Sequence, residues 1–178
     1  MTKTELRHFY KKKREAVSSE LPRISAEIST HLHAYIRETQ PQCIAGYLAA
    51  QTEPSLDVFL EQCLAEGIRI VVPLATAEGY CLADWQPGHE SVGPYGIREP
   101  QGHLVSVASD LWLVPGLAFD RSGARLGYGK GIYDRLLVDS SGTRMGVCPS
   151  CCVAEGLVAD VWDVPMHGVV TELGLKLL

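Results

Sequence analysis

Three glycines at alternate positions, Gly127, Gly129 and Gly131, mark the part of the sequence best suited to chemistry. They lie in Arg125-Leu-Gly-Tyr-Gly-Lys-Gly-Ile-Tyr-Asp134, between a predicted strand and a predicted helix. Glycine lets backbone N–H groups approach an anion closely, and a helix N-terminus adds partial positive charge. The spacing matches neither the dinucleotide fingerprint nor a Walker loop. A phosphate-binding loop is therefore one interpretation, and a tight turn that merely needs glycines is the other.

Charged residues around this loop favour the phosphate interpretation. Arg125 and Lys130 flank the glycines, and Asp134 falls in the first turn of the helix, where a carboxylate can hold Mg²⁺ or simply cap the helix. Because the whole chain has 16 Lys and Arg against 21 Asp and Glu, a net charge of −5, a nucleoside triphosphate would need a local cationic cluster. Lys3 and Arg7, one helical turn apart, would complete that cluster.

The composition excludes several classes of protein. With 178 residues, 46% hydrophobic and 21% charged, the chain fits one globular domain over residues 1–178. Its acidic balance disfavours nucleic-acid binding, and it lacks both the ~20 apolar residues of a membrane span and a secretory signal. We therefore expect a cytoplasmic monomer that acts on small molecules.

Hydrophobic periodicity predicts the elements that must position the loop. Apolar residues at helical spacing indicate helices over residues 2–20 and 21–39, another after residue 53, and one starting near Ile132. Short apolar runs predict strands at residues 43–49, 68–75, 111–119, 144–148 and 169–173. Residues 76–110 are interpreted as an excursion over one face of the sheet that could form a substrate wall, with a strand at 81–85. Since strand, helix and strand alternate, the predicted fold is a three-layer Rossmann-like α/β sandwich, with a mostly parallel sheet flanked by helices.

A cysteine cluster near the C-terminus offers a second kind of chemistry. Cys148-Pro-Ser-Cys151-Cys152 looks like half of a zinc site, but no second CxxC follows. His103 and His167 show no ligand spacing to it. We expect reduced, structural thiols without zinc, and a metal site is the alternative.

The run VPGLAFDRSGARLGYGKGIYDRLL, Val114–Leu137, closely resembles the signature of the 5-formyltetrahydrofolate cyclo-ligase family, also called methenyltetrahydrofolate synthetases. This central run is long and specific. Four shorter matches, each weak alone, extend the resemblance from Lys3 to Glu172: the Lys3/Arg7 pair, YLAAQTE at Tyr47–Glu53, GPYGIREP at Gly93–Pro100 and WDVPMHGVVTE at Trp162–Glu172.

The resemblance implies an ATP- and Mg²⁺-dependent conversion of 5-formyltetrahydrofolate to 5,10-methenyltetrahydrofolate, in which the formyl oxygen is phosphorylated and nitrogen-10 closes the ring. It implies ATP contacts at Lys3, Arg7, Arg125, Leu126, Gly127, Tyr128, Gly129, Lys130, Gly131, Ile132 and Tyr133. It implies folate contacts at Leu48, Glu53, Tyr128, Gly129, Lys130, Gly131 and Ile132. It implies catalytic roles for Glu53, Arg125 and Lys130, and Mg²⁺ ligation by Asp134 and Asp163.

Several of these residues also have a plain structural interpretation. Leu48 would be core, Glu53 an acid at a helix start, and residues 11–14, Lys-Lys-Lys-Arg, a solvated face. Ile132 replaces an aromatic residue usual in the family, which removes stacking at that point. Two rival functions stay open: a noncatalytic nucleotide- or folate-binding module on the same scaffold, and an ATP-dependent enzyme with a different acceptor.

Overall fold

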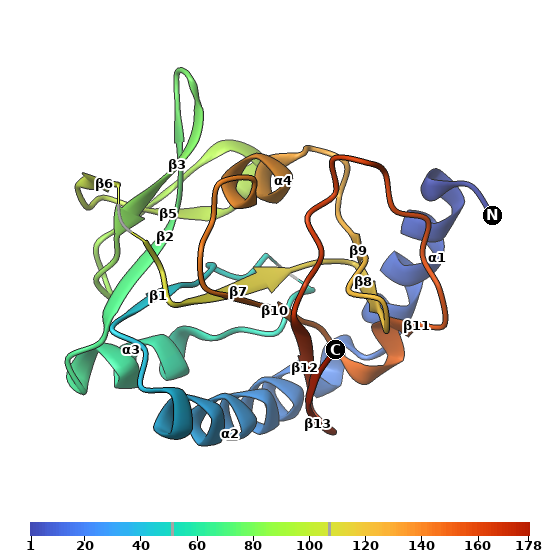
Figure 1. Cartoon of the computed structure of the whole chain (residues 1–178), viewed down its shortest axis with the longest axis horizontal. Coiled ribbons are helices and arrows are strands. Elements are labelled where there is room, and N and C mark those ends of the chain that lie inside the picture. Colours follow the sequence, from blue (N-terminus) through green and yellow to red (C-terminus); the bar gives the residue numbers. More distant parts are fainter. Residues whose placement is uncertain (51, 107) are drawn as a thin grey trace.

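The computed structural model describes residues 1–50, 52–106 and 108–178; Gln51, inside the Tyr47–Glu53 match, and Val107 lie outside the described residues. Eight described strands form the main sheet, in the order β13-β12-β10-β7-β1-β2-β3-β6 (Figure 1). Their bounds are β1 Cys43–Ala45, β2 Arg69–Thr76, β3 Gly79–Asp84, β6 Leu104–Val105, β7 Leu111–Pro115, β10 Thr143–Val147, β12 Gly168–Thr171 and β13 Gly174–Leu177.

The centre of this sheet is parallel and its edges are antiparallel. The five strands β12, β10, β7, β1 and β2 pair in parallel, whereas β13 joins one edge and β3 and β6 the other in antiparallel register. The predicted strand-helix-strand unit is present, with α3 Asp57–Ala65 connecting β1 to β2. The mostly parallel sheet expected from the sequence is therefore confirmed.

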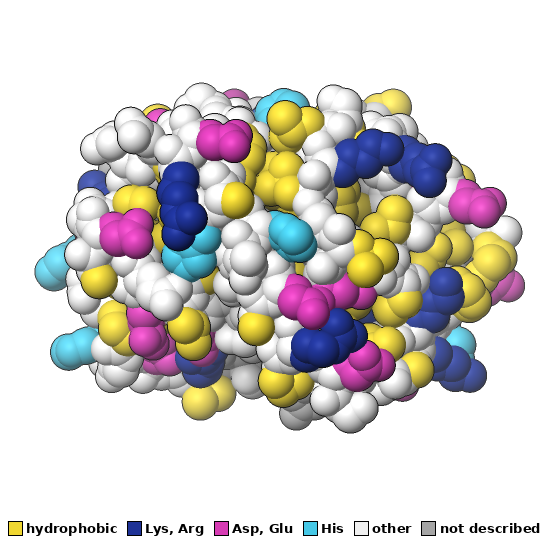
Figure 2. Space-filling view, turned by 90° about the horizontal axis from the view of Figure 1, so that it is seen from below, with side chains coloured by type: hydrophobic (Ala, Val, Ile, Leu, Met, Phe, Trp, Pro, Cys, Tyr) yellow, Lys and Arg dark blue, Asp and Glu magenta, His cyan; other side chains and the backbone are white. Residues whose placement is uncertain are grey.

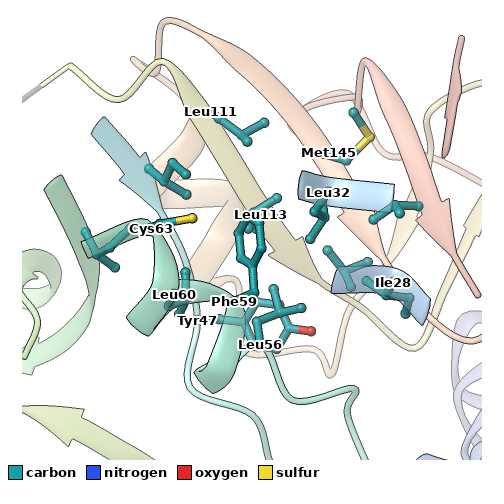
Figure 3. Packing of buried hydrophobic residues seen from close by; sticks show 14 of the residues in the cluster. Ile28, Leu32, Tyr47, Leu56, Phe59, Leu60, Cys63, Leu111, Leu113 and Met145 are labelled. Atoms are coloured by element: carbon teal, nitrogen blue, oxygen red, sulfur yellow. The ribbon is translucent and has the colours of Figure 1, made fainter. Parts of the chain in front are cut away.

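Helices cover both faces of the sheet. Alternate residues of a strand point to opposite faces, and here both sets are apolar and pack against helices. On β7, Leu111 and Leu113 pack into a cluster with α3 and with α2 Leu21–Thr39 (Figure 3). Trp112 and Val114 instead pack into a second cluster, which holds residues of α1 Lys3–Ala16 and α4 Ile132–Leu137. The result is the predicted three-layer arrangement.

The helix signals in the sequence have clear structural counterparts. On α2, Ile24, Ile28, Leu32 and Ile36 recur every fourth residue and are all buried. The helix is capped by Gln40, the residue after Thr39, which adopts a left-handed conformation (φ 47°). The first predicted helix ends earlier than expected, at Ala16, and a short 3₁₀ turn, η1 Ser18–Glu20, follows it.

The predicted strand over residues 111–119 is in fact two strands in different sheets. After β7, the chain leaves the main sheet at Gly116 and forms β8 Ala118–Asp120, which pairs with β9 Arg125–Leu126 and β11 Val153–Ala154. Proline lacks the N–H that would continue the ladder beyond Pro115. A side chain at Gly116 would lie 2.8 Å from the Phe119 ring, so this break requires glycine.

The prediction for residues 76–110 is wrong in part. A two-residue turn pairs Thr76 with Gly79, so β3 and then β6 continue the main sheet rather than crossing its face. The segment between β3 and β6 forms a separate hairpin, the β4–β5 arm. It consists of β4 Glu90–Val92 and β5 Arg98–Pro100, joined through η2 Pro94–Gly96. The strand β13 also adds a C-terminal hairpin that the sequence patterns did not indicate.

The surface seen from below, over α2 and α3, mixes basic and acidic side chains rather than gathering one sign of charge (Figure 2). Within the described ranges, no helix combines the length and the apolar character that a membrane span requires.

Candidate functional site

A cavity of about 370 Å³ opens where the parallel strands end. It is lined by Tyr47 and Leu48, which follow β1, and by Pro115, the last residue of β7. Ligands of open α/β sheets characteristically bind at these carboxyl ends. All the site residues predicted from the sequence line this one cavity: Lys3, Arg7, Leu48, Glu53, every residue from 125 to 134, and Asp163.

The glycine loop between β9 and α4 forms one wall of the cavity. Gly129 and Gly131 have φ values of +88° and +64°, so the backbone itself requires glycine there. Arg7 packs directly against the loop: its Nε donates to the Gly127 carbonyl at 3.0 Å, and a side chain at Gly129 would come within 3.3 Å of its guanidinium carbon. The predicted helix after the loop is confirmed, although it is only six residues long.

Each acidic residue predicted to bind Mg²⁺ is paired with a cation. Asp134 accepts a hydrogen bond from the Arg125 guanidinium, and Asp163 accepts one from Lys3 Nζ at 3.1 Å. Lys3 also contacts Asp160, at 2.5 Å, a residue that sequence reasoning missed. Burial lowers the pKa of Lys3, but the hydrogen bonds to Asp160 and Asp163 outweigh it, so the pKa rises above its ordinary value.

The structure permits a direct test of whether these carboxylates suit Mg²⁺. Among the described residues, no three His, Cys, Asp or Glu side chains are grouped to cage a metal. Mg²⁺, however, usually takes one or two carboxylates, several waters and the phosphates of its substrate. Arg125 also keeps a buried Nε without a partner in the described part of the chain, which suits an incoming anion. The donor set therefore fits an ion that arrives with phosphate, and Asp134 and Asp163 as its ligands remain a prediction.

A second wall, which adjoins the loop, is built around Glu53, which is only 8% exposed. One of its oxygens accepts from the Ala50 backbone N–H at 2.8 Å, and the other from the Tyr128 hydroxyl at 2.9 Å. Because α3 begins at Asp57, the helix-start interpretation of Glu53 is wrong. Leu48 belongs to the core cluster and also lines the cavity, so its two interpretations are compatible.

Tyrosines surround this carboxylate. Burial, reinforced by the charge of Glu53, raises the pKa of Tyr128 and of Tyr133 well above the ordinary value. Burial and the same charge raise the pKa of Tyr47. All three phenols are therefore protonated at neutral pH and can act as hydrogen-bond donors.

Comparison with known proteins identifies the family. The model of the 5-formyltetrahydrofolate cyclo-ligase family matches residues 1–172. The chain belongs to this family. It is 33% identical over 140 residues to the 5-formyltetrahydrofolate cyclo-ligase of Mycolicibacterium smegmatis, and the match covers 72% of each chain. The resemblance stated from the sequence is thereby confirmed.

Two solved structures have the same architecture as this cyclo-ligase family member. The 5,10-methenyltetrahydrofolate synthetase of Aquifex aeolicus superposes with a TM-score of 0.88 at 33% identity, covering 99% of this chain and 93% of that one. The synthetase of Mycoplasma pneumoniae superposes with a TM-score of 0.77 at 24% identity, covering 97% and 99%, which supports the fold alone.

A third wall of the cyclo-ligase cavity comes largely from residues 76–110, the stretch expected to form a substrate wall, but its members were not predicted individually as site residues. Its members come from β2, β3 and the β4–β5 arm: Pro73, Tyr80, Tyr95, Ile97, Arg98 and Glu99. The arm reaches the glycine loop, where Lys130 Nζ lies 4.5 Å from the centre of the Tyr95 ring. The GPYGIREP match pointed to this arm, but no sequence signal distinguished Tyr80 or Pro73.

Arg14 was wrongly interpreted as part of a solvated face. Its neighbours Lys11, Lys12 and Lys13 are exposed as expected, but Arg14 is fully buried. It points inward from α1, and its Nε donates to the Thr52 carbonyl at 2.9 Å. Helical spacing placed Arg14 correctly on α1 but did not show that loops from elsewhere in the chain close over it.

The cysteine cluster lies outside the cyclo-ligase cavity. Cys148 and Cys152 are buried, and the sulfurs of Cys151 and Cys152 are 3.9 Å apart. Burial raises the pKa of Cys148, and burial together with Cys151 raises the pKa of Cys152 to about 12. The Cys148 and Cys152 thiols are therefore protonated and pack as small hydrophobic groups. That the protein binds no zinc stays a prediction.

Proposed function

We propose that this member of the cyclo-ligase family converts 5-formyltetrahydrofolate to 5,10-methenyltetrahydrofolate, with ATP and Mg²⁺, and releases ADP and phosphate. The observation that carries the proposal is the single cavity that joins a cationic glycine loop to a buried carboxylate. The loop suits a phosphate chain, and the Glu53 wall suits a pterin, which presents N–H donors. One cavity that holds both allows the two substrates to react directly.

In the proposed reaction the folate supplies its own nucleophile. The formyl oxygen attacks the terminal phosphorus of ATP, the bond to ADP breaks, and the formyl carbon now carries a phosphate ester. Nitrogen-10 then attacks that carbon and loses its proton, and phosphate leaves with the formyl oxygen. This sequence requires no protein nucleophile, so the protein acts by alignment and charge stabilisation.

The cations of the loop wall would perform the first of these tasks. Arg125 and Lys130, with Lys3 and Arg7 from α1, would hold the phosphates and stabilise the charge that develops on the transferring group. Arg7 is already oriented by its hydrogen bond to Gly127. Mg²⁺, held by Asp134 and Asp163, would neutralise phosphate charge when bound.

Glu53 would perform the second task, orienting the folate. Its oxygens each accept one hydrogen bond from the protein and keep further lone pairs for pterin N–H groups. We assign to Glu53 the acceptance of the proton that nitrogen-10 releases. Leu48 and Ile132 would supply apolar contacts to the ring system.

We also propose that the protein is a monomer acting on small molecules, with one domain over residues 1–178 working in the cytoplasm. Light scattering of the purified protein checks the oligomeric state.

The activity is tested by following methenyl absorbance with 5-formyltetrahydrofolate, ATP and Mg²⁺. We expect product only with ATP, and none with a nonhydrolysable analogue. Equal product formation without ATP would contradict the phosphorylation step. ATP hydrolysis that leaves 5-formyltetrahydrofolate unchanged would favour a different acceptor, and binding without any turnover would favour a noncatalytic module.

A further inference from the structure

Arg14 is a buried charged residue beside the site that the proposed reaction leaves unused. It is 0% exposed and does not line the cavity, yet it joins three segments that do. Its guanidinium donates to the Thr52 carbonyl, next to Glu53, to the Gly116 carbonyl, next to Pro115, and to the Tyr128 hydroxyl at 2.5 Å.

We propose that Arg14 is a positioning residue for folate binding, which holds the Tyr128 phenol where it donates its hydrogen bond to Glu53. This inference rests on the proposed function, because it takes Glu53 as the group that binds the pterin. It adds a residue on α1, remote in sequence from Glu53 and from the glycine loop, to the machinery of the site.

The direction of the hydrogen bonds follows from the chemistry of the three groups. A guanidinium has only donors, so the Tyr128 oxygen must accept from Arg14. The phenol proton is then directed toward Glu53, whose carboxylate can only accept. With its other oxygen held by the Ala50 N–H, Glu53 is fixed at both ends. Arg14 thereby orients Glu53 without touching it.

The charge of Arg14 supports the same assignment. Within the described residues it forms no direct ion pair, and its second terminal nitrogen has no hydrogen-bond partner. A buried cation without a direct counter-ion is costly, so a structural role alone gives a poor reason for it. The Tyr128 phenol links it to a buried anion, Glu53, across a single hydroxyl group.

The ring of Tyr128 needs such a support. It sits between Gly127 and Gly129, in a loop that the glycines leave conformationally free, and the residue is 46% exposed. The Arg14 guanidinium carbon also lies 5.7 Å from the centre of the Tyr128 ring. Without Arg14, the phenol would lose the contacts that hold it in position against Glu53.

The test is a double-mutant cycle on Arg14→Met and Tyr128→Phe, read by the equilibrium affinity for 5-formyltetrahydrofolate and, separately, for ATP. Each single variant should bind 5-formyltetrahydrofolate about tenfold more weakly. The double variant should bind no more weakly than either single one, because both remove the same link. In Arg14→Met the affinity for ATP should change less than about twofold, because Arg14 does not line the cavity. Arg14→Lys should recover part of the loss of folate affinity.

Lys12→Met is the matched control, since it also replaces a cation by methionine, at an exposed position of α1, and should leave both affinities unchanged. Should Arg14→Met fail to fold, Arg14→Lys replaces it in the cycle, with thermal unfolding measured for every variant.

Losses of folate affinity that multiply in the double variant, or equal losses for folate and ATP in Arg14→Met, overturn the positioning role and leave Arg14 as a structural residue. Unchanged folate affinity in both Arg14→Met and Arg14→Lys overturns it as well. A wild-type protein that binds no 5-formyltetrahydrofolate overturns the proposed function and this role together, whereas the other results overturn only the role of Arg14.

Discussion

The two main walls of the cavity are built in opposite ways. The loop wall is a contiguous stretch, residues 125–134, in which Tyr128, Gly129 and Lys130 are exposed. The Glu53 wall is buried and held by distant contacts: Tyr128 lies 75 positions from Glu53 and 114 from Arg14. The charge of Lys130 in the loop wall is screened by water, whereas the hydrogen bonds of Glu53 in the buried wall act in a low dielectric. Substitutions should therefore cost more in the buried wall.

The largest expected effect is that of Glu53→Gln. The amide keeps the shape of the side chain but loses the charge and presents an NH₂ donor toward Tyr128 or Ala50, both of which already donate to this group. We expect kcat/KM for 5-formyltetrahydrofolate to fall by about 100-fold, corresponding to roughly 3 kcal/mol. Methenyl absorbance at saturating ATP measures this change.

Glu61→Gln, an exposed position on α3, is the control for Glu53→Gln and should retain full activity. If Glu53→Gln lost less activity than substitutions in the loop wall, the ranking of the two walls would be reversed, and Glu53 would be a packing residue of the cavity.

Arg7→Ala should have the next largest effect, and on the other substrate. Removing a charge-assisted contact of about 1.5–3 kcal/mol should raise the KM for ATP by about tenfold or more. The KM for 5-formyltetrahydrofolate should stay within about twofold. Lys11→Ala, one turn further along α1 and exposed, is the matched control. Unchanged ATP dependence in Arg7→Ala would mean that Arg7 supports the loop without contacting phosphate.

The sequence could predict the loop wall because its residues are contiguous. The alternate glycines, Arg125, Lys130 and Asp134 stand in one run, so local spacing alone indicated a binding loop, and α1 needed only the one-turn spacing of Lys3 and Arg7. The parallel centre of the sheet was equally predictable, because buried strands separated by a helix leave few arrangements.

The buried wall could not be predicted in this way. Its key contacts join α1, the segment after β1 and the glycine loop, and no periodicity encodes which loops cover a helix face. From the sequence, Arg14 was therefore interpreted only as the last of four basic residues, Lys-Lys-Lys-Arg, at positions 11–14. The break between β7 and β8 at Pro115 and Gly116 was also missed. The apolar run continues across this break, and hydropathy alone does not show that Pro115 lacks the backbone N–H needed to continue the ladder.

Asp134→Asn and Asp163→Asn should separate two roles within the loop wall. Both variants should fold and should need about tenfold more Mg²⁺ for half-maximal rate if these carboxylates ligate the ion. Asp134 also pairs with Arg125, so Asp134→Asn should raise the KM for ATP as well. Asp163→Asn should not, because Lys3 keeps its salt bridge to Asp160. Titration of the rate with Mg²⁺ at fixed ATP measures both effects.

Asp139→Asn, an exposed residue just beyond α4, is the control for this pair and should leave the Mg²⁺ dependence unchanged. Full turnover at limiting Mg²⁺ in Asp134→Asn would return that residue to the role of a salt-bridge partner of Arg125, and the same result in Asp163→Asn would leave it a partner of Lys3.

The smallest expected effect lies where the β4–β5 arm meets the loop wall. Lys130 lies over the Tyr95 ring, and because Tyr95 is 66% exposed, such a contact contributes only about 0.5–1 kcal/mol. Tyr95→Leu should therefore raise the KM for ATP about two- to fivefold by releasing Lys130, whereas Tyr95→Phe, which keeps the ring face, should not. Position 95 has a backbone φ of 66°, and Tyr, Leu and Phe would all bear the same strain there. The comparison of the variants therefore isolates the effect of the aromatic ring. Equal KM values in the Leu and Phe variants would show that the arm does not position Lys130.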